Sequence, residues 1–398
     1  MSFQDQLGQI QQKLSEYQLD GWLIYNFRGC NPFATKILEM TAGKLSSRRY
    51  FYYIPASGVP QKLVHSIEQY DLDHLPGDKT IYNTWKSLHD GVKKILTGVN
   101  TVCMEYSPNN DIPYLSKVDA GTVEFIRSFN VNIISSGDIV QYFEARWTDE
   151  QYAEAQDTAN ILLRTVDKAF SFIGDRLRNG TTVTEYDVQR LIMDEFDRNN
   201  LTTYAPANCS VNGNGANPHY DPSAEQSAAI KKGDYILIDW WAKKKKPAAV
   251  YADFTWVGFA GEEIPKKYQE VFDIVKGSRD AAVEYLVKEM KAGRKIRGCD
   301  VDDVTRKYIE KNGYGQFFVH RTGHNIGEEV HGNGAHIDNF ETMDVREIIP
   351  ETCFSIEPGI YLPGEFGIRL EIDVYISKTK EVILLGDTYQ KEIVKIQC

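Results

Sequence analysis

The sequence has few cysteines and no long uncharged apolar run. Its six cysteines are scattered, without a C-x-x-C pair, which argues against a disulfide framework and favours a reducing compartment. No apolar run reaches the roughly 18 residues that a membrane-spanning helix needs. The polar N-terminus carries Leu7, Ile10 and Leu14 at helical spacing and lacks the apolar core of a signal peptide. We therefore expect a cytoplasmic protein that has no membrane partner.

Basic residues are fewer than acidic residues. Lys and Arg number 45 against 56 Asp and Glu, so the formal net charge is -11 at pH 7. A field of this sign repels the phosphates of nucleic acids, and we expect no nucleic-acid partner. The composition, 42% hydrophobic and 25% charged, is that of an ordered globular protein and excludes extensive disorder.

The length of 398 residues exceeds what one hydrophobic core usually organises. Apolar, β-rich runs at 22–25, 50–54, 63–65 and 101–104 predict a small α/β domain in the first third. A helix-start signature, Thr148-Asp149-Glu150-Gln151, then precedes a long apolar-periodic stretch. We predict domains at 1–146 and 147–398, the second of them α+β, with further helices over 184–199, 265–291 and 301–311.

Two aspartates lie on predicted strands of the second domain, where a buried acid is costly unless something pairs with it. Asp239 ends the apolar run 235–238, and Asp253 lies within 250–256. The four lysines at 243–246 are typical of a solvated hairpin tip, which places both aspartates on one face of adjacent antiparallel strands. Two carboxylates so close together either share a proton or are neutralised by a cation.

Three more candidates follow on predicted strand segments: His324 between Gly323 and Gly327, then Glu357 and Glu371. The glycines would allow another backbone to approach closely and leave the imidazole accessible. Each candidate alone is an ordinary core or surface residue. Together, two Asp, one His and two Glu offer four negative charges, which match two divalent cations and suit manganese, iron, cobalt or zinc. The sequence therefore predicts a paired-metal site.

In this order, Asp, Asp, His, Glu, Glu, the segments resemble the pita-bread metallopeptidase family of methionine aminopeptidase, aminopeptidase P and prolidase. The first domain resembles the N-terminal domain of the aminopeptidase P, prolidase and creatinase branch. The resemblance implies an α+β fold class, with a pita-bread catalytic domain after a smaller α/β creatinase-like domain. It also implies two divalent metal ions per chain, manganese first and cobalt, zinc or iron as alternatives. Asp239 would chelate one metal, Asp253 and Glu371 would bridge both, and His324 with Glu357 would complete the second.

The resemblance assigns further roles around these ligands. Glu357 would carry a proton from the nucleophile to the leaving amine. His219 and His331 would stabilise the tetrahedral intermediate and orient the substrate, although either histidine taken alone is more commonly structural. Arg369 would hold the ligand carboxylates in place.

Some positions depart from the family pattern without removing a ligand. Asn325 stands where glycine is frequent, Gly332 stands where an acid often follows the histidine, and Trp256 stands where arginine is frequent. These departures leave the substrate pocket open to question. Trp240 and Trp241 are candidates for a wall around a proline ring, although paired tryptophans beside a strand are usually core.

We predict a dinuclear metal-dependent hydrolase that cleaves the Xaa-Pro bond at the N-terminus of peptides, of the aminopeptidase P or prolidase type. Its partners would be short proline-containing peptides and, as the resemblance implies, a second copy of the chain in a homodimer. One alternative is the same fold redirected to a non-peptide small substrate, as in creatinase-like hydrolases or lyases, which the departures around His331 support. Another is a non-catalytic interaction module, which the complete ligand set argues against.

Overall fold

The chain divides into two compact units, Met1–Glu144 and Ala145–Cys398. The computed structural model describes residues 3–40, 46–218 and 220–398. The domain limits expected from the sequence, 1–146 and 147–398, stay a prediction, as do the homodimer and the cytoplasmic location.

The first unit is built around one six-stranded sheet. All its strands except β2 run in the same direction. The strand order is β4 (Asp78–Tyr82), β3 (Gln61–His65), β2 (Tyr50–Pro55), β1 (Gly21–Asn26), β5 (Thr101–Met104) and β6 (Asn132–Ser135). One face packs against α1 (Phe3–Glu16), α2 (Pro32–Ile37) and α5 (Gly137–Glu144), and the other against α3 (Trp85–Ile95) and α4 (Ala120–Arg127). The expected small α/β domain is confirmed.

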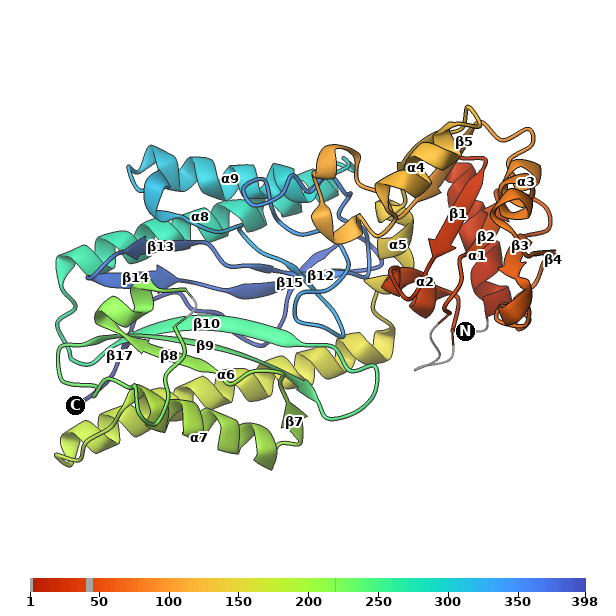
Figure 1. Cartoon of the computed structure of the whole chain (residues 1–398). Coiled ribbons are helices and arrows are strands. Elements are labelled where there is room, and N and C mark those ends of the chain that lie inside the picture. The colour runs from red at the N-terminus through yellow and green to blue at the C-terminus, as the bar shows by residue number, and fades with distance from the viewer. Residues whose placement is uncertain (1–2, 41–45, 219) are drawn as a thin grey trace. The chain divides into compact units, whose positions relative to one another are not determined.

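Four helices of the second unit enclose its strands (Figure 1). They are α6 (Asp149–Arg178), α7 (Glu185–Arg198), α8 (Lys266–Lys291) and α9 (Gly298–Lys311). The predicted start of α6 is confirmed, because Thr148 and Gln151 form a capping box with side-chain bonds of 2.8 and 3.2 Å. The expected start at 301 is wrong for α9, which begins at Gly298 because Asp300 accepts a bond of 2.9 Å from the Arg297 amide and caps the helix earlier.

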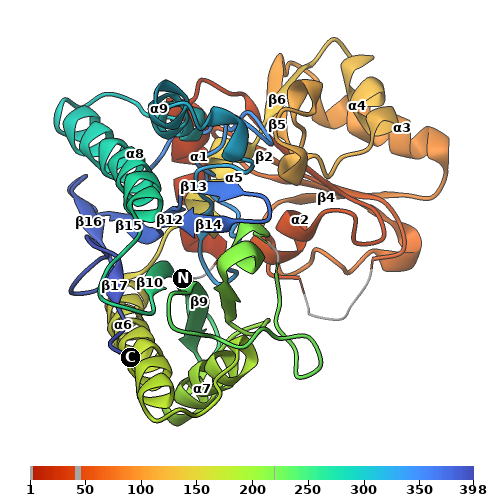
Figure 2. The same cartoon turned by 90° about the vertical axis from the view of Figure 1, so that its left-hand side faces the viewer.

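The strands of the second unit form two main sheets and a hairpin. The first sheet has the order β17 (Val394–Lys395), β10 (Ala252–Phe259), β9 (Tyr235–Lys244) and β7 (Leu201–Thr202), with β8 (Asn208–Val211) also beside β9. The second has the order β11 (Asn325–Ile326), β12 (Cys353–Ile356), β15 (Ile372–Ile376) and β16 (Val382–Leu384), and the hairpin joins β13 (Gly359–Leu362) to β14 (Phe366–Arg369). Figures 1 and 2 show α6 and α7 on one side of these strands and α8 and α9 on the other.

The register of β9 and β10 decides which side chains face the interior of the unit. Thr255 lies opposite Asp239 and Asp253 lies opposite Trp241, so both aspartates and Trp241 share one face, as the sequence predicted for the aspartates. Trp240 points the other way into the core under α6, where its indole donates to the Leu162 carbonyl at 3.1 Å. The strand period of two therefore separates the tryptophan pair into one core and one site residue.

The lysine run is more ordered than a solvated tip. β9 extends through Lys244, so half of the run belongs to the strand. Lys244 forms an ion pair with Asp157, and Lys246 lies 3.0 Å from Glu150, both acids of α6. Lys245 and Lys246 at the turn are exposed, as expected for a solvated hairpin tip, whereas Lys243 and Lys244 belong to the strand and α6 presents acidic side chains along this hairpin. Exposed pairs of this kind add little to stability, because solvent screens them.

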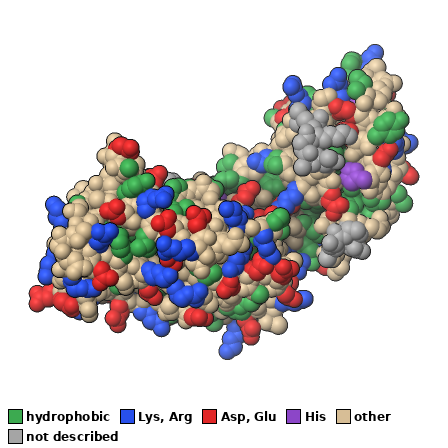
Figure 3. Space-filling view, turned by 90° about the horizontal axis from the view of Figure 1, so that it is seen from below, with side chains coloured by type: hydrophobic (Ala, Val, Ile, Leu, Met, Phe, Trp, Pro, Cys, Tyr) green, Lys and Arg blue, Asp and Glu red, His purple; other side chains and the backbone are tan. Residues whose placement is uncertain are grey.

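None of the helices in the described ranges combines the length and apolarity that crossing a membrane requires. In the view from below, the surface of the second unit carries basic and acidic side chains intermingled rather than gathered by sign (Figure 3).

Candidate metal centre and active site

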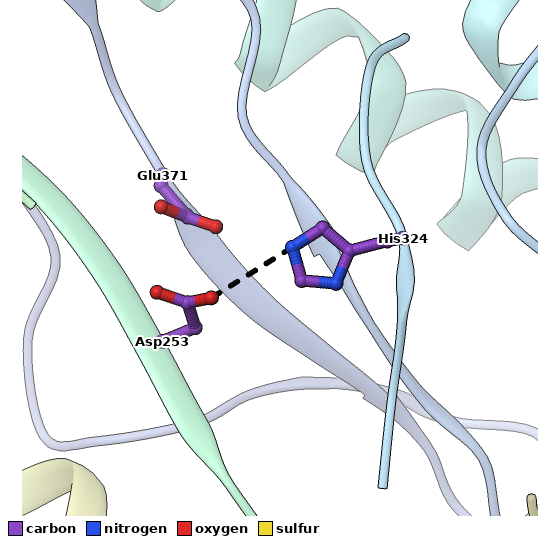
Figure 4. A group of neighbouring side chains, drawn as sticks. All are labelled: Asp253, His324 and Glu371. Carbon is purple, nitrogen blue, oxygen red and sulfur yellow. Dashed lines mark ion pairs between the residues drawn. The ribbon is translucent and has the colours of Figure 1, made fainter. Parts of the chain in front are cut away.

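Three of the predicted ligands converge on one buried point of the second unit. Asp253 lies on β10, His324 immediately precedes β11, and Glu371 lies between β14 and β15. One ligand atom from each lies within 4.8 Å of the other two, and the side chains point toward one another (Figure 4). All three residues are at most 4% exposed. These ligands reach one point from segments far apart in the sequence.

The other two predicted ligands adjoin this group. Glu357 follows β12 directly, and its Oε1 lies 3.3 Å from His324 Nε2. Asp239, on β9, lines the same pocket but forms an ion pair with Arg369 and lies outside the 4.8 Å group. The expectation that all five lie on strands is wrong for His324, Glu357 and Glu371, which occupy the residues just before or after a strand. At these positions the chain leaves the sheet, so the side chains can turn into the pocket.

A close backbone approach places His324 against β12. The His324 amide donates to Ser355 Oγ at 3.0 Å, and the Ser355 amide donates to the His324 carbonyl at 2.8 Å. A Cβ at Gly323 would collide with the Ser355 carbonyl, so only glycine fits there. The expectation of a close approach is confirmed for Gly323, whereas a Cβ at Gly327 would meet nothing within 4 Å.

Burial and mutual repulsion oppose the ionisation of these carboxyl groups in the metal-free protein. Burial first, and then neighbouring carboxylates, raise the pKa of Asp253 and of Glu371 well above the ordinary range. Burial raises the pKa of Glu357 to about 7. Burial also lowers the pKa of His324 well below its usual value, which keeps the imidazole neutral and its Nε2 lone pair available. The imidazole of His324 therefore adds no positive charge to the group of three ligands.

The donor set fits a divalent cation. Within the described part of the chain, the buried Asp253 Oδ1 has no hydrogen-bond partner, and the same holds for Asp373 Oδ1 behind it. An unpaired buried carboxylate oxygen is costly, and a cation would satisfy it. Oxygen ligands with a single imidazole suit manganese, iron, cobalt or zinc.

These pKa shifts predict that the metal-free protein loses stability as pH rises. Glu357 shifts from 4.5 to about 7 on folding, so its contribution is complete below pH 4.5 and is lost as pH rises through about 7. The upward shifts of Asp253 and Glu371 act in the same direction. Thermal unfolding of metal-stripped protein between about pH 5 and pH 8 should show a falling Tm, and saturating manganese should suppress the fall. A metal-free Tm that is level or rising over this range would contradict the prediction.

Arg369 connects the ligand carboxylates through a buried network. It pairs with Asp239 and donates from Nε to Thr255 Oγ1 at 3.0 Å. Thr255 in turn donates to Glu371 Oε2 at 2.7 Å, so one guanidinium orients two ligands directly or through one hydroxyl. Tyr361 accepts a further bond of 3.2 Å from Arg369 Nη1. The role that the family resemblance implies for Arg369, to hold the ligand carboxylates in place, stays a prediction.

The ligands open onto a cavity of about 420 Å³. His331 lines it, exposed, with its ring 4.3 Å from that of His324. His219 lies outside the described residues, but its neighbours Pro218 and Tyr220 line the cavity. Sequence reasoning missed most of the other lining residues, among them Tyr204, Tyr220, Asp221, Arg321 and Glu341. Among the lining residues without a predicted role, Trp241 is the one that the sequence could indicate. It lies two residues after Asp239 on the same strand, so the two side chains share a face.

The structure relates two of the departures from the family pattern to each other. The Asn325 side chain donates to the Cys353 carbonyl and accepts from the Gly334 amide, both at 2.8 Å. A Cβ at residue 332 would collide with Asn325 Oδ1, so Asn325 requires Gly332. Trp256, the third departure, packs in the core under α6 and does not line the cavity.

One buried carboxylate organises the loop that carries Tyr220. Glu185, fully buried at the start of α7, accepts four hydrogen bonds of 2.6–2.9 Å. Their donors are the Val211 and Ala228 amides, the Asn214 side chain and the Tyr220 hydroxyl. Glu185 thus holds both ends of the loop, at Val211 and Ala228, together with the cavity-lining Tyr220, against α7.

Glu185→Gln is expected to weaken substrate binding through this loop. Glutamine keeps one acceptor oxygen and turns a donor toward groups that also donate, which should cost about 1.5–3 kcal/mol of stability. We expect KM to rise about tenfold with kcat changed less, because the predicted metal ligands lie on other segments. Steady-state kinetics and metal content check this, with Glu225→Gln, an exposed glutamate of the same loop, as the control. Unchanged KM in a folded Glu185→Gln protein would rule the role out.

Comparison with known proteins assigns this chain to a family. The model of metallopeptidase family M24 matches residues 155–378, more than half of the chain. The chain belongs to metallopeptidase family M24. The matched span of this M24 member contains all five predicted ligands, and the family resemblance inferred from the sequence is confirmed.

One relative of this M24 chain is a dipeptidase. It is 32% identical to an Xaa-Pro dipeptidase of Lactobacillus delbrueckii subsp. lactis over 209 residues, 52% of this chain and 51% of the relative. The match thus spans about half the length of that relative.

Solved structures show the fold. The prolidase of Thermococcus sibiricus superposes with a TM-score of 0.59 at 20% identity, over 99% of both chains. An X-prolyl aminopeptidase of Caenorhabditis elegans, described as a cytosolic enzyme with a di-nuclear active site, gives 0.61 at 16% identity, over 99% of this chain and 63% of that one. The expected α+β class, a pita-bread domain after a smaller α/β domain, is confirmed.

Proposed function

We propose that this chain is a two-metal peptidase that cleaves the Xaa-Pro bond at the N-terminus of short peptides. The observation that carries the proposal is the buried group of Asp253, His324 and Glu371, with Glu357 and Asp239 beside it, at the floor of a cavity. Membership of a metallopeptidase family supports hydrolysis of a peptide bond. The names of its relatives, Xaa-Pro dipeptidase and prolidase, support the proline specificity.

In this proposal the five ligands hold two divalent ions. Asp239, Asp253, His324, Glu357 and Glu371 would supply the carboxylate and imidazole ligands of these ions. Manganese is proposed first, with cobalt, zinc or iron as alternatives, because such ligands serve several ions and availability often decides. When bound, two divalent ions lower the pKa of water toward neutrality and polarise the substrate carbonyl.

The chain's own residues would then move protons and position the substrate. Glu357 accepts a proton from the attacking water and delivers it to the nitrogen of the leaving amine. His331, exposed beside His324, donates a hydrogen bond to the oxygen on which charge develops. His219 is proposed to act with it, as the family resemblance implies. Arg369 keeps Asp239 in place and keeps Glu371 in place through Thr255.

Hydrolysis of a Gly-Pro dipeptide and an Arg-Pro-Pro tripeptide by metal-stripped protein tests the proposal. Manganese, cobalt or zinc is restored separately, and metal content is measured in parallel. Cleavage that depends on a restored metal supports the Xaa-Pro peptidase, and the preferred length separates a dipeptidase from an aminopeptidase. Tight binding of two ions without cleavage of either peptide would redirect the search to a non-peptide substrate. Negligible metal binding would instead favour a non-catalytic module.

A further inference from the structure

A second cavity lies within the first unit and shares no lining residue with the metal centre. Its volume is about 720 Å³, inside the range of about 300–1,000 Å³ that is typical of small-molecule sites. Aromatic side chains make up much of its described wall, namely Tyr25, Phe27, Phe51, Tyr82, Trp85 and Phe125. The charged side chains on that wall are Arg48, Arg49 and Asp119. An aromatic wall with an excess of positive charge suits an aromatic anion.

The cavity lies at the edge of the sheet where three strands of the same direction end. Tyr25 is the last residue but one of β1, and His65 and Tyr82 end β3 and β4. The antiparallel β2 begins directly after Arg49, and the cavity-lining Trp85 begins α3. Side chains and the first turns of helices enclose the space here, because no strand continues into it. The carboxyl edge of an open α/β sheet is a common place for a ligand.

A row of rings joins α3 to α4 along the cavity wall. Trp85 and His89 lie one turn apart on α3, with ring centroids 5.4 Å apart. His89 lies 4.2 Å from Phe125 of α4, with 34° between the ring planes, and Figure 2 shows the two helices near each other. Trp85 is 62% exposed and Phe27 is 40% exposed, although large aromatic residues are mostly buried. Rings open to solvent at the wall of a cavity offer a surface on which a planar ring stacks.

Arg49 contributes a half-buried positive charge that pairs with no carboxylate in the described part of the chain. Burial raises the pKa of Tyr25 to about 12 and also raises that of Tyr82, and the nearby Arg49 charge opposes both rises. The Tyr82 hydroxyl donates to the Arg49 carbonyl at 2.7 Å, which holds this backbone in place. Asp119, the acid on the described wall, accepts from the Thr122 amide and hydroxyl, both at 2.8 Å, and caps α4. An anion in the cavity would therefore meet a guanidinium without a carboxylate partner.

We propose that this cavity binds a mononucleotide, with its base against the rings of His89 and Phe125 and its phosphate at Arg49. A phosphate group carries about -1.5 to -2 charges at pH 7, which suits Arg49 together with the neighbouring, exposed Arg48. The net charge of -11 repels long nucleic acids, whereas a single phosphate responds mainly to charges within the Debye length of about 8 Å. This site is independent of the proposed peptidase activity.

Calorimetric titration of the full-length, manganese-loaded protein with adenosine monophosphate, adenosine and inorganic phosphate tests the proposal. The nucleotide should bind at one such site per chain, at least about tenfold more tightly than either fragment, because it alone offers both a ring and a phosphate. The titration is repeated with Asp253→Ala, which lacks a proposed metal ligand. An unchanged affinity there separates this cavity from phosphate binding at the metal centre.

Two cavity variants separate the ring from the phosphate. Arg49→Gln should weaken nucleotide binding about tenfold to a hundredfold and leave adenosine within about threefold. Phe125→Leu keeps an apolar side chain but removes the ring, so it should weaken the nucleotide and adenosine alike, by about tenfold, and leave inorganic phosphate unchanged. Arg28→Gln, an exposed arginine of the same unit outside the described cavity wall, is the matched control. Circular dichroism checks that each variant is folded.

Three outcomes would overturn the proposal. The first is a nucleotide that does not bind, or that binds no more tightly than adenosine and phosphate. The second is an unchanged nucleotide affinity in folded Arg49→Gln protein. The third is loss of nucleotide binding in folded Asp253→Ala protein, which would assign the phosphate to the metal centre. Peptide cleavage enters none of these measurements, so failure of the proposed function leaves their outcome unaffected.

Discussion

Asp253→Ala is expected to remove metal binding and to lower peptide hydrolysis by about a thousandfold or more. Asp253 is 4% exposed and contributes an atom to the group that spans 4.8 Å with His324 and Glu371. Its Oδ1 has no partner within the described chain, so a bound cation is the group that would satisfy it. Loss of a proposed metal ligand would remove charge stabilisation worth several kcal/mol from the transition state, and each 1.36 kcal/mol changes the rate about tenfold.

Metal content by mass spectrometry and kcat/KM on Gly-Pro measure this effect. The variant should fold, because it removes a buried carboxyl group whose pKa burial and neighbouring acids raise in the metal-free protein. Circular dichroism checks the fold, and Asp273→Ala, an exposed aspartate of α8, serves as the matched control. A folded Asp253→Ala protein that keeps its metal and its activity would show that the chemistry occurs elsewhere.

Glu357→Gln is expected to lower kcat by about a hundredfold to ten-thousandfold at saturating metal, with a smaller change in KM. Glutamine has nearly the same shape but cannot take up a proton. The metal-free pKa of about 7 shows how strongly burial opposes the charge of this carboxyl group. Bound cations would favour the ionised form and shift the pKa downward. The acid limb of the pH profile of kcat should therefore disappear in Glu357→Gln, because the group that must be deprotonated is gone.

Titration of manganese into Glu357→Gln separates proton transfer from metal binding, because Glu357 is proposed for both. Ser355→Ala is the matched control, since it removes only the hydroxyl that lies 3.2 Å from Glu357 Oε1 and 3.0 Å from the His324 amide. We expect it to change kcat by less than about tenfold. Full kcat in Glu357→Gln once metal is saturating would assign the proton transfer to another group.

Local signals in the sequence were sufficient for much of the fold. The capping box at Thr148 and the apolar period after it are short-range features, and α6 begins where they predict. The same holds for α7, whose cap Thr184 precedes an amphipathic stretch. The start of α9 was misplaced because its cap depends on Asp300, a signal weaker than the apolar period around it.

The candidate ligands could also be named from the sequence, because acids in apolar strand-like runs are costly and therefore conspicuous. Asp239 and Asp253 even had a predictable shared face, since the side-chain period of a strand is two. Arg321 and Glu185 carried no such signal. An arginine or glutamate in a polar stretch is usually on the surface, and only the folded chain shows one lining a cavity and the other accepting four hydrogen bonds.

The sequence by itself determined the family, the five candidate ligands and the two types of folding unit, because ligand chemistry and apolar periodicity are properties of short segments. Only the tertiary structure decided which ligand atoms meet within 4.8 Å, that Asp239 pairs with Arg369, and that Trp241 rather than Trp240 faces the site. It also placed Arg321 on the cavity wall. These outcomes depend on strand register and on contacts between segments more than a hundred residues apart, such as Thr255 with Glu371. No local pattern encodes such distances.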